Sequence, residues 1–352
     1  MLDDLKLISE IDKSEMLNAV ENFSKQIKES KEIIDSANLS SIFKVDNIII
    51  SGMGASAISG DIIQSLYRQR SDIPIFVTRQ YDLPKWANKN TLVLSHSYSG
   101  NTEETLSTFK HAYQKHCKII GFSSGGKLQE YCEKRNISHI KIPSGFQPRA
   151  ATGYPLFSSI YALNKTGVIT YDMEAEIKET ITLVEDLSKH NNRNVLEKEN
   201  LSKQISKKIV NKIPRIYGWD FYTPIAKRWC TQFNENSKMI SSFYEASEAS
   251  HNDIVGWSMD PEASKNHVCI LFRDHENESI YMATHLNFMK ELFEGVAGAV
   301  IEIPVSGKKP LAKMMYLMQL GDFISCYIAI LRKVDPTPVS IIKELKEKLA
   351  KL

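Results

Sequence analysis

Apolar residues recur along the chain at two different spacings. Between residues 13 and 36 they stand three or four positions apart, at Met16, Leu17, Val20, Phe23 and Ile27. This spacing predicts an amphipathic helix. Further along, short apolar runs alternate with helical stretches, first over residues 45–143 and again over residues 215–304. Parallel strands need long crossover connections, so both alternations predict an α/β fold with parallel sheets flanked by helices.

Each alternation has its own set of predicted elements. The first has strands at 45–51, 73–78, 91–96, 117–122 and 138–143, with helices at 57–67, up to about 115, and at 127–135. The second has strands at 215–218, 239–244, 267–272 and 299–304, with helices at 224–234, 279–293, 310–333 and 338–351. The charged segment 172–211 between them has only a helical period. We therefore predict an N-terminal domain over residues 1–165, and a helical connector with a C-terminal domain over residues 166–352.

Composition and charge narrow the class of protein. Apolar residues make up 42% of the chain and charged residues 24%, with a net charge of +2, which is typical of a globular protein and unlike a nucleic-acid-binding one. The start of the chain has no basic segment followed by an apolar one, and the longest apolar run, about 326–331, is too short to span a bilayer. We expect a cytoplasmic protein without a membrane or nucleic-acid partner.

The cysteines do not indicate a metal site. Five are scattered along the chain, at Cys117, Cys132, Cys230, Cys269 and Cys326, with no C-x-x-C pair and no short Cys/His cluster. Structural zinc sites need such spacing. We therefore expect reduced, mostly buried thiols and no metal.

Two loops have the composition of an anion site. Ser51-Gly-Met-Gly-Ala-Ser56 follows the first predicted strand, and Ser97-Tyr-Ser-Gly-Asn-Thr102 follows the strand at 91–96. Ligands of open parallel sheets collect at the carboxyl ends of strands, where glycine allows close approach and helix N-termini favour negative charge. Serine and threonine hydroxyls add neutral donors. The loops together predict a phosphate site.

Two other interpretations of these loops stay open on the pattern alone. Helix capping explains part of the second loop, because Asn101 and Glu104 are spaced like a capping box. The first loop resembles a dinucleotide fingerprint, since Gly52-x-Gly54 opens a helix after a strand. The third glycine position is Ala57, however, and no acid closes the strand at 73–78, which disfavours NAD.

Five motifs in order along nearly the whole chain carry a family resemblance. They are Ser51–Ser56, Ser95–Thr105, Gln147-Pro-Arg149, Phe233-Asn-Glu235-Asn and Glu248–Trp257. Together they resemble the bifunctional phosphoglucose/phosphomannose isomerases, which consist of two flavodoxin-like sugar isomerase (SIS) domains. The resemblance implies interconversion of glucose 6-phosphate or mannose 6-phosphate with fructose 6-phosphate through a cis-enediol, without metal or other cofactor, in a homodimer.

The resemblance also implies which residues bind the phosphate group of the substrate. They are Gly54, Ala55, Ser56, Ser97, Ser99 and Thr102. The chain departs from the family at one of them, because the family usually has glycine where Ala55 stands. Thr105 lies one turn into the predicted helix, where ordinary packing explains it better.

Four residues match the catalytic positions of the family. Glu235 matches the base that carries a proton between C2 and C1, which suits a carboxylate because it can take a proton and return it. His251 matches the ring-opening histidine, which in the family comes from the partner subunit, and Glu248 could orient it. Arg149 matches a permanent cation that stabilises the enediolate. Lys346 matches a lysine that assists ring opening, with Lys343, one helical turn away, as the alternative.

Two further functions remain as alternatives. A regulatory protein that senses a phosphosugar could use the same domain, but no basic helix-turn-helix precedes Val45 and the net charge is near zero. An amidotransferase isomerase domain would be expected to accompany an N-terminal cysteine nucleophile, and none is present. The matches at Arg149, Glu235 and His251 favour the isomerase.

Overall fold

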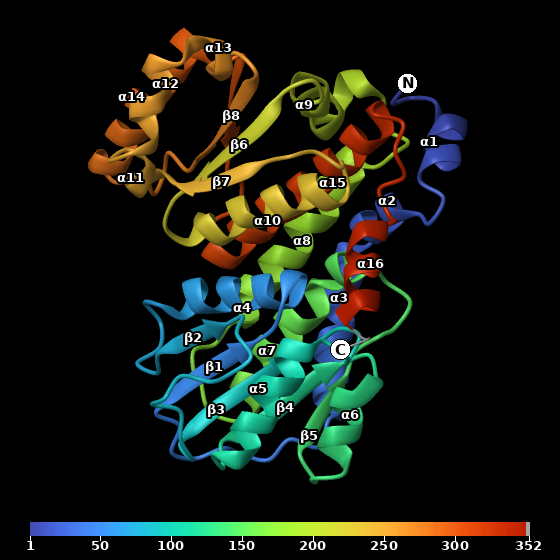
Figure 1. Ribbon diagram of the computed structural model, residues 1–352, viewed down its shortest axis with the longest axis vertical. Helices are drawn as coiled ribbons and strands as arrows, with labels where there is room; N and C mark the ends of the chain where they lie inside the picture. Colours follow the sequence, from blue (N-terminus) through green and yellow to red (C-terminus); the bar gives the residue numbers. More distant parts are fainter. Residues whose placement is uncertain (350–352) are drawn as a thin grey trace.

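The computed structural model describes residues 1–349 and has two parallel sheets, one in each half of the molecule (Figure 1). The first sheet contains β1 (Asn47–Ser51), β2 (Ile75–Thr78), β3 (Thr91–His96), β4 (Lys118–Ser123) and β5 (Ser138–Lys141). Its strands are all parallel and lie in the order β2-β1-β3-β4-β5. This is the flavodoxin order, as predicted.

Helices cover both faces of the first sheet. They are α3 (Phe23–Ser36), α4 (Gly54–Tyr67), α5 (Glu103–Gln114), α6 (Gly126–Glu133) and α7 (Gly153–Lys165). Successive side chains of a strand point to opposite faces, so Ile48 packs in the core with α4 and α7, whereas Ile49 packs with Ala112 of α5. Helix α7 was not predicted, because it is buried on nearly all sides and has no exposed polar face along its length.

The second half repeats the arrangement with four strands. They are β6 (Ile213–Gly218), β7 (Ser242–Glu245), β8 (His267–Arg273) and β9 (Ala299–Pro304), all parallel and in the order β7-β6-β8-β9. The helices are α10 (Thr223–Glu235), α11 (Ala246–Ala249), α12 (Asp253–Met259), α13 (Pro261–Ser264), α14 (Ile280–Val296), α15 (Pro310–Leu331) and α16 (Ser340–Leu349). The prediction of two flavodoxin-like α/β domains is confirmed.

The connector and the N-terminal helices both pack on α15. The connector contains α8 (Glu174–Asn191) and α9 (Leu201–Ile209), and α8 also contacts α3 of the first half. The predicted helix over 13–36 is in fact two helices, α2 (Met16–Glu21) and α3, separated at Asn22. Helices α1 (Leu5–Ile11) and α2 share a small core with Phe323 and Tyr327 of α15. The boundary at residue 165 stays a prediction.

The apolar run at about 326–331, which we expected to be too short to span a bilayer, belongs to a longer apolar helix, α15. Its 22 residues are long and apolar enough to cross a membrane by length and composition, although 89% of its apolar window is buried inside the protein. The polar residues Gln319 and Asp322 interrupt the apolar run but are themselves buried. The helix is therefore explained as the central core helix of the second half.

Gly321 of α15 lies against the ring of Trp229 on α10. A Cβ atom at this position would stand 2.2 Å from the indole nitrogen, and the Trp229 Nε1–H already donates to Leu317 O at 2.7 Å. We predict that Gly321→Ala weakens the folded state by about 1–3 kcal/mol through overpacking. Gly295→Ala on α14, where a Cβ meets nothing within 4 Å, should be neutral or stabilising. Equal midpoints of urea unfolding for the two variants would contradict this.

Candidate active site

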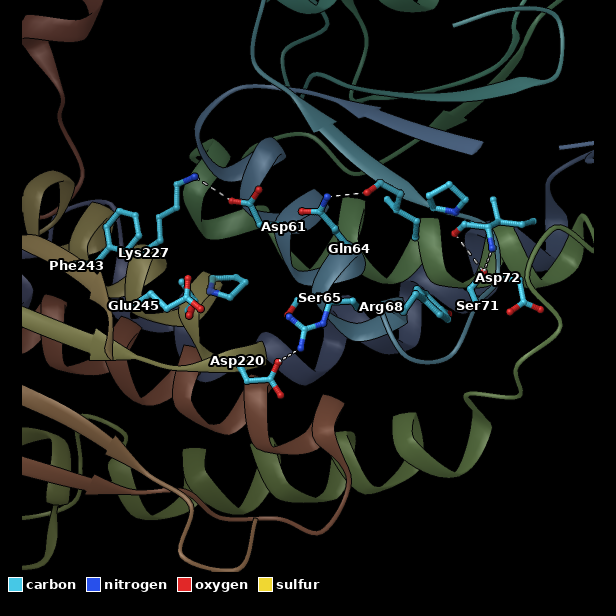
Figure 2. Close-up of a pocket in the computed structure, with 16 residues that line it drawn as sticks. Asp61, Gln64, Ser65, Arg68, Ser71, Asp72, Asp220, Lys227, Phe243 and Glu245 are labelled. Carbon is cyan, nitrogen blue, oxygen red and sulfur yellow. Dashed lines mark hydrogen bonds and ion pairs between the residues drawn. The ribbon is translucent and has the colours of Figure 1, made fainter. Parts of the chain in front are cut away.

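Helices α4 and α10 run antiparallel across the boundary between the two halves. Arg68, just after α4, pairs with Asp220, just before α10, at 2.7 Å, and Asp61 of α4 pairs with Lys227 of α10 at 3.0 Å (Figure 2). Asp61 lies seven residues before Arg68, whereas its partner Lys227 lies seven residues after Asp220. The two segments therefore run in opposite directions. The first turn of α4 and the last turn of α10 are thus at the same end of the helix pair.

A groove surrounds these ion pairs, at the other end of the two helices. It has a volume of about 610 Å³ and is lined by residues of α4, β2, α10 and β7. Figure 2 shows Gln64, Ser65 and Glu245 along it, with Asp61 and Lys227 joined above and Arg68 and Asp220 below. None of the predicted site residues lines this groove, so the predicted chemistry is located elsewhere.

The first predicted phosphate loop leads directly from β1 into α4. Gly52 allows the loop to pass close to β3, because a Cβ there would lie 3.1 Å from His96 O. Gly54 has φ +51, which favours glycine, whereas Ala55 is not among the residues with positive φ. The departure from the family at Ala55 therefore causes no backbone strain. Gly54, Ala55 and Ser56 open α4, so their N–H groups lie at the end of the helix that favours anions.

The second loop is held together by its own hydroxyl groups. Ser97 Oγ donates to Thr102 Oγ1 at 2.8 Å and accepts from the Thr102 N–H at 3.2 Å, whereas Ser99 is exposed. Gly100 has φ +70, and a Cβ there would overlap Gly125 O at 1.8 Å. The loop thus needs glycine at this position to pack against the N-terminal end of α6.

The predicted capping box in the second loop is wrong. Thr102, not Asn101, is the N-cap residue of α5, and its side chain makes no capping bond. Asn101 Oδ1 instead accepts from Lys127 N–H of α6 at 3.1 Å, because the loop turns toward that helix. Thr105 donates to His96 O at 3.3 Å and is buried, as its packing role predicts. The first N–H groups of α5 are therefore left for another acceptor.

Both loops meet at the switch point of the first sheet. They follow β1 and β3, which are neighbours in register at Ser51 and Ser95. From β1 the chain continues to β2 on one side, and from β3 it continues to β4 on the other, so the strand order reverses between β1 and β3. Open α/β sheets bind ligands at such a position. The structure thus gathers the predicted phosphate-binding residues at one edge of one sheet.

His96 is a residue of this region that sequence reasoning missed. Its ring lies behind both loops, with Nε2 2.8 Å from Ser159 Oγ and Nδ1 3.1 Å from Ser59 Oγ. Burial lowers the pKa of His96 to about 4, so the ring is neutral at physiological pH. Only long-range contacts with α4 and α7 reveal this burial, and no sequence pattern indicates it.

Arg149 and Glu235 come together from opposite halves of the molecule. Arg149 lies in a single 3₁₀ turn (Pro148–Ala151) and is 3% exposed, and its Nη1 is 3.4 Å from Glu235 Oε2. Its Nε donates to Asn236 Oδ1 at 2.6 Å, and its Nη2 donates to Pro336 O and Thr337 O at 2.7 and 2.8 Å. Burial lowers the pKa of Arg149, but a guanidinium stays charged at any physiological pH.

A second buried arginine holds Arg149 from behind. Arg228 of α10 donates to the backbone carbonyl of Arg149 at 2.5 Å and to Thr152 Oγ1 at 3.1 Å. Its charge is balanced by Asp322 of α15 at 2.9 Å. Sequence reasoning missed this support, because the three residues are far apart in the chain.

Glu235 ends α10 and keeps part of its side chain in solvent. The side chain is 30% exposed, while the neighbouring Asn236 is fully buried. Since α10 and α4 are antiparallel, the carboxylate lies at the same end of the helix pair as the first phosphate loop. One chain therefore pairs Arg149 with Glu235 and places the pair at the same end of α4 and α10 as the first predicted phosphate loop.

Within one chain, His251 does not lie beside Arg149 and Glu235. Glu235 precedes the amino end of β7, whereas His251 follows its carboxyl end and the short helix α11. The two residues therefore lie at opposite ends of the second sheet (Figure 1, where α11 marks the end on the side of His251). His251 is exposed, with its ring centroid 6.4 Å from that of His285. Glu248 accepts from Asn252 Nδ2 at 2.7 Å, so its carboxylate orients Asn252.

Lys346 also lies apart from Glu235 within one chain. It is exposed on α16, and within residues 1–349 no hydrogen bond or ion pair joins it to Arg149 or Glu235. Lys343 is on the same helix one turn earlier. What the structure does place beside Arg149 is the turn that leads into α16, at Pro336 and Thr337.

The described residues contain no group of three or more His, Cys, Asp or Glu side chains placed to hold a metal ion. All five cysteines are free, and four of them are buried. A metal-free reaction stays a prediction.

The buried neutral His96 predicts a pH dependence of stability. The pKa of His96 is about 4 when folded and near 6.5 when unfolded, so the unfolded chain binds more protons between these values. The contribution of neutral His96 to the free energy of unfolding is complete above pH 6.5 and declines by up to about 3 kcal/mol as the pH falls toward 4. In urea unfolding, His96→Gln should lose less stability than the wild type between pH 6.5 and 4.5. Parallel pH profiles would contradict the prediction.

Known proteins are similar to this chain over most of its length. The bacterial phospho-glucose isomerase C-terminal SIS domain model matches residues 198–349. The bifunctional phosphoglucose/phosphomannose isomerase of Caldicellulosiruptor bescii is 40% identical over 349 residues, covering 96% of this chain and 99% of that protein. The D-glucosamine-6-phosphate 4-epimerase of Sulfolobus acidocaldarius is 30% identical over 243 residues, covering 67% and 72%.

A solved structure of a candidate phosphosugar isomerase from Clostridium difficile 630 has a TM-score of 0.73 at 17% identity, and covers 92% of this chain and 95% of that one. This likeness confirms the fold. The identity of 40% over nearly the full length of both chains establishes the family. The chain belongs to the bifunctional phosphoglucose/phosphomannose isomerase family.

Proposed function

We propose that this protein interconverts glucose 6-phosphate or mannose 6-phosphate with fructose 6-phosphate. The observation that carries the proposal is the Arg149–Glu235 pair, at 3.4 Å, at the same end of the α4–α10 pair as the phosphate loops. A carboxylate beside a permanent cation can move a proton while the cation stabilises the charge that develops. Family membership supports the choice of substrates.

The positions of these groups assign each of them a step in the reaction. The substrate phosphate binds the first turns of α4 and α5 through backbone N–H groups and the hydroxyls of Ser56, Ser97, Ser99 and Thr102. Glu235 takes the proton from C2 of the open aldose, and the electrons move onto O1 to give a cis-enediolate. The guanidinium of Arg149 stabilises that charge. Glu235 then returns the proton to C1 while the hydroxyl proton on O2 passes to O1, so that the carbonyl forms at C2.

Ring opening would require residues of a second subunit. We propose a homodimer in which His251 reaches the site of the partner, with Lys346 assisting, since His251 and Glu235 lie at opposite ends of the second sheet in one chain. Exposed apolar side chains beside His251 support an interface there. They are Val255 and Met259 of α12 and Ile280, Tyr281 and Phe288 of α14, each 56–80% exposed.

We also propose a cytoplasmic location, with no membrane or nucleic-acid partner. Five free cysteines support a reducing compartment. A net charge of +2 gives no general attraction to polyanions.

The substrates can be tested directly on the purified protein. Glucose 6-phosphate and mannose 6-phosphate are each offered in a coupled assay that detects fructose 6-phosphate, with and without EDTA. We expect product from both sugars and no effect of EDTA. Turnover of neither sugar under either condition would overturn the function, and a 4-epimer as the product would indicate an epimerase instead. Loss of activity only with EDTA would overturn the metal-free mechanism.

Glu235→Gln tests the proposed base. The variant keeps the shape of the side chain but cannot accept the proton, so kcat should fall by about 10²- to 10⁴-fold. Glu245→Gln, at the exposed end of β7 in the groove, is the matched control and should keep wild-type turnover. Turnover of Glu235→Gln within severalfold of the wild type would show that the base is wrong.

Mixed dimers test the contribution of the partner subunit. Glu235→Gln and His251→Ala chains, each inactive alone, are unfolded and refolded together. If His251 acts across the interface, half of the dimers carry one intact site, so about a quarter of the wild-type activity should return. A mixture no more active than its separate components would mean that His251 acts within its own chain.

A further inference from the structure

Lys238 has a backbone conformation that lysine rarely adopts. It follows the end of α10 by three residues and has φ +54, in the left-handed region where only glycine is free of strain. Such strain persists only where the surrounding structure maintains it, and it is concentrated at functional sites. Lys238 lies only three residues after Glu235, the proposed base.

The ammonium group of Lys238 joins two parts of the site. Its Nζ donates to the backbone carbonyl of Glu235 at 2.5 Å and to Pro336 O at 3.1 Å. Pro336 O also accepts from Arg149 Nη2 at 2.7 Å. Two cations thus bind one carbonyl of the turn that leads into α16. The group is half-buried, and burial together with the nearby charge of Arg149 lowers the pKa of Lys238.

The end of α10 does not need this side chain for closure. The Asn236 N–H donates to Gln232 O at 2.7 Å, and the Met239 N–H donates to Phe233 O at 3.0 Å. These backbone bonds satisfy carbonyls of the last turn. What the Lys238 side chain adds is a bond to the peptide of Glu235 itself and a link from that peptide to the turn at 335–337.

We propose that Lys238 is a positioning residue of the isomerase site, which fixes the peptide of Glu235 against the turn at 335–337 and so couples the base to α16. The inference rests on the proposed function. Lys238 touches no reacting atom in this scheme. It acts through Glu235, whose carboxylate must be held within a fraction of an ångström for proton transfer.

A pair of glycine substitutions separates this role from a structural one. Lys238→Gly removes the two side-chain bonds but relieves the backbone strain, and Lys44→Gly relieves the same strain at an exposed residue, with φ +56, in the loop before β1. Both variants should keep or raise the thermal midpoint. Only Lys238→Gly should lower kcat, by about 10- to 100-fold, with KM changing less than threefold because the phosphate loops are untouched. Lys238→Met, which keeps the strain and loses the donors, should lose kcat to the same extent.

Hydrogen exchange gives a second measurement that does not depend on activity. Amides of residues 335–345 should exchange faster in Lys238→Gly than in Lys44→Gly, because the turn loses one of its two cationic donors. Unchanged exchange there would overturn the coupling, and faster exchange with kcat within threefold of the wild type would overturn the positioning role. If the wild type isomerises neither sugar, the proposed function fails, and the exchange comparison still decides the link between Glu235 and the turn.

Discussion

A guanidinium held almost entirely out of water joins the two halves of this molecule. Arg149 belongs to the first half, and the side chain and carbonyls that it binds, from Asn236 to Thr337, belong to the second. A buried charge is costly unless it is paired and fully hydrogen-bonded. The two sheets therefore cannot shift relative to each other without leaving this charge uncompensated, and the candidate site exists only in their observed arrangement.

The antiparallel pair of α4 and α10 explains why the site lies between the halves. The N-terminus of a helix is its positive end and the C-terminus its negative end. The first turn of α4 is therefore suited to an anionic phosphate, while the last turn of α10 presents Glu235 beside the cation that balances it. In the proposed function, this one geometric relation between two helices positions both ends of a phosphosugar, the phosphate group and the carbon atoms that react.

Local pattern predicted the strands, most helices and the two glycine- and serine-containing loops after β1 and β3, because their spacing and turn residues are encoded over a few positions. Helix α7 was missed because it is buried on nearly all sides and has no exposed polar face, and the capping box at Asn101 was wrong because Lys127 of another helix competes for its side chain. His96 and Arg228 owe their roles to contacts 37 to 94 residues away, which no short pattern contains. The pairing of Arg149 with Glu235 likewise depends on tertiary structure.

The contact between α2 and α15 has a consequence for synthesis of the chain. Leu17 and Val20 pack with Phe323 and Tyr327, about 300 residues later. At ribosomal rates of about 5–20 residues per second, the N-terminal helices wait roughly 15 to 60 seconds before their packing partner exists. The first sheet, complete by residue 141, can form within that interval. Helices α1 and α2 thus leave the ribosome well before their packing partner, and their apolar side chains stay available to chaperones until α15 has been made.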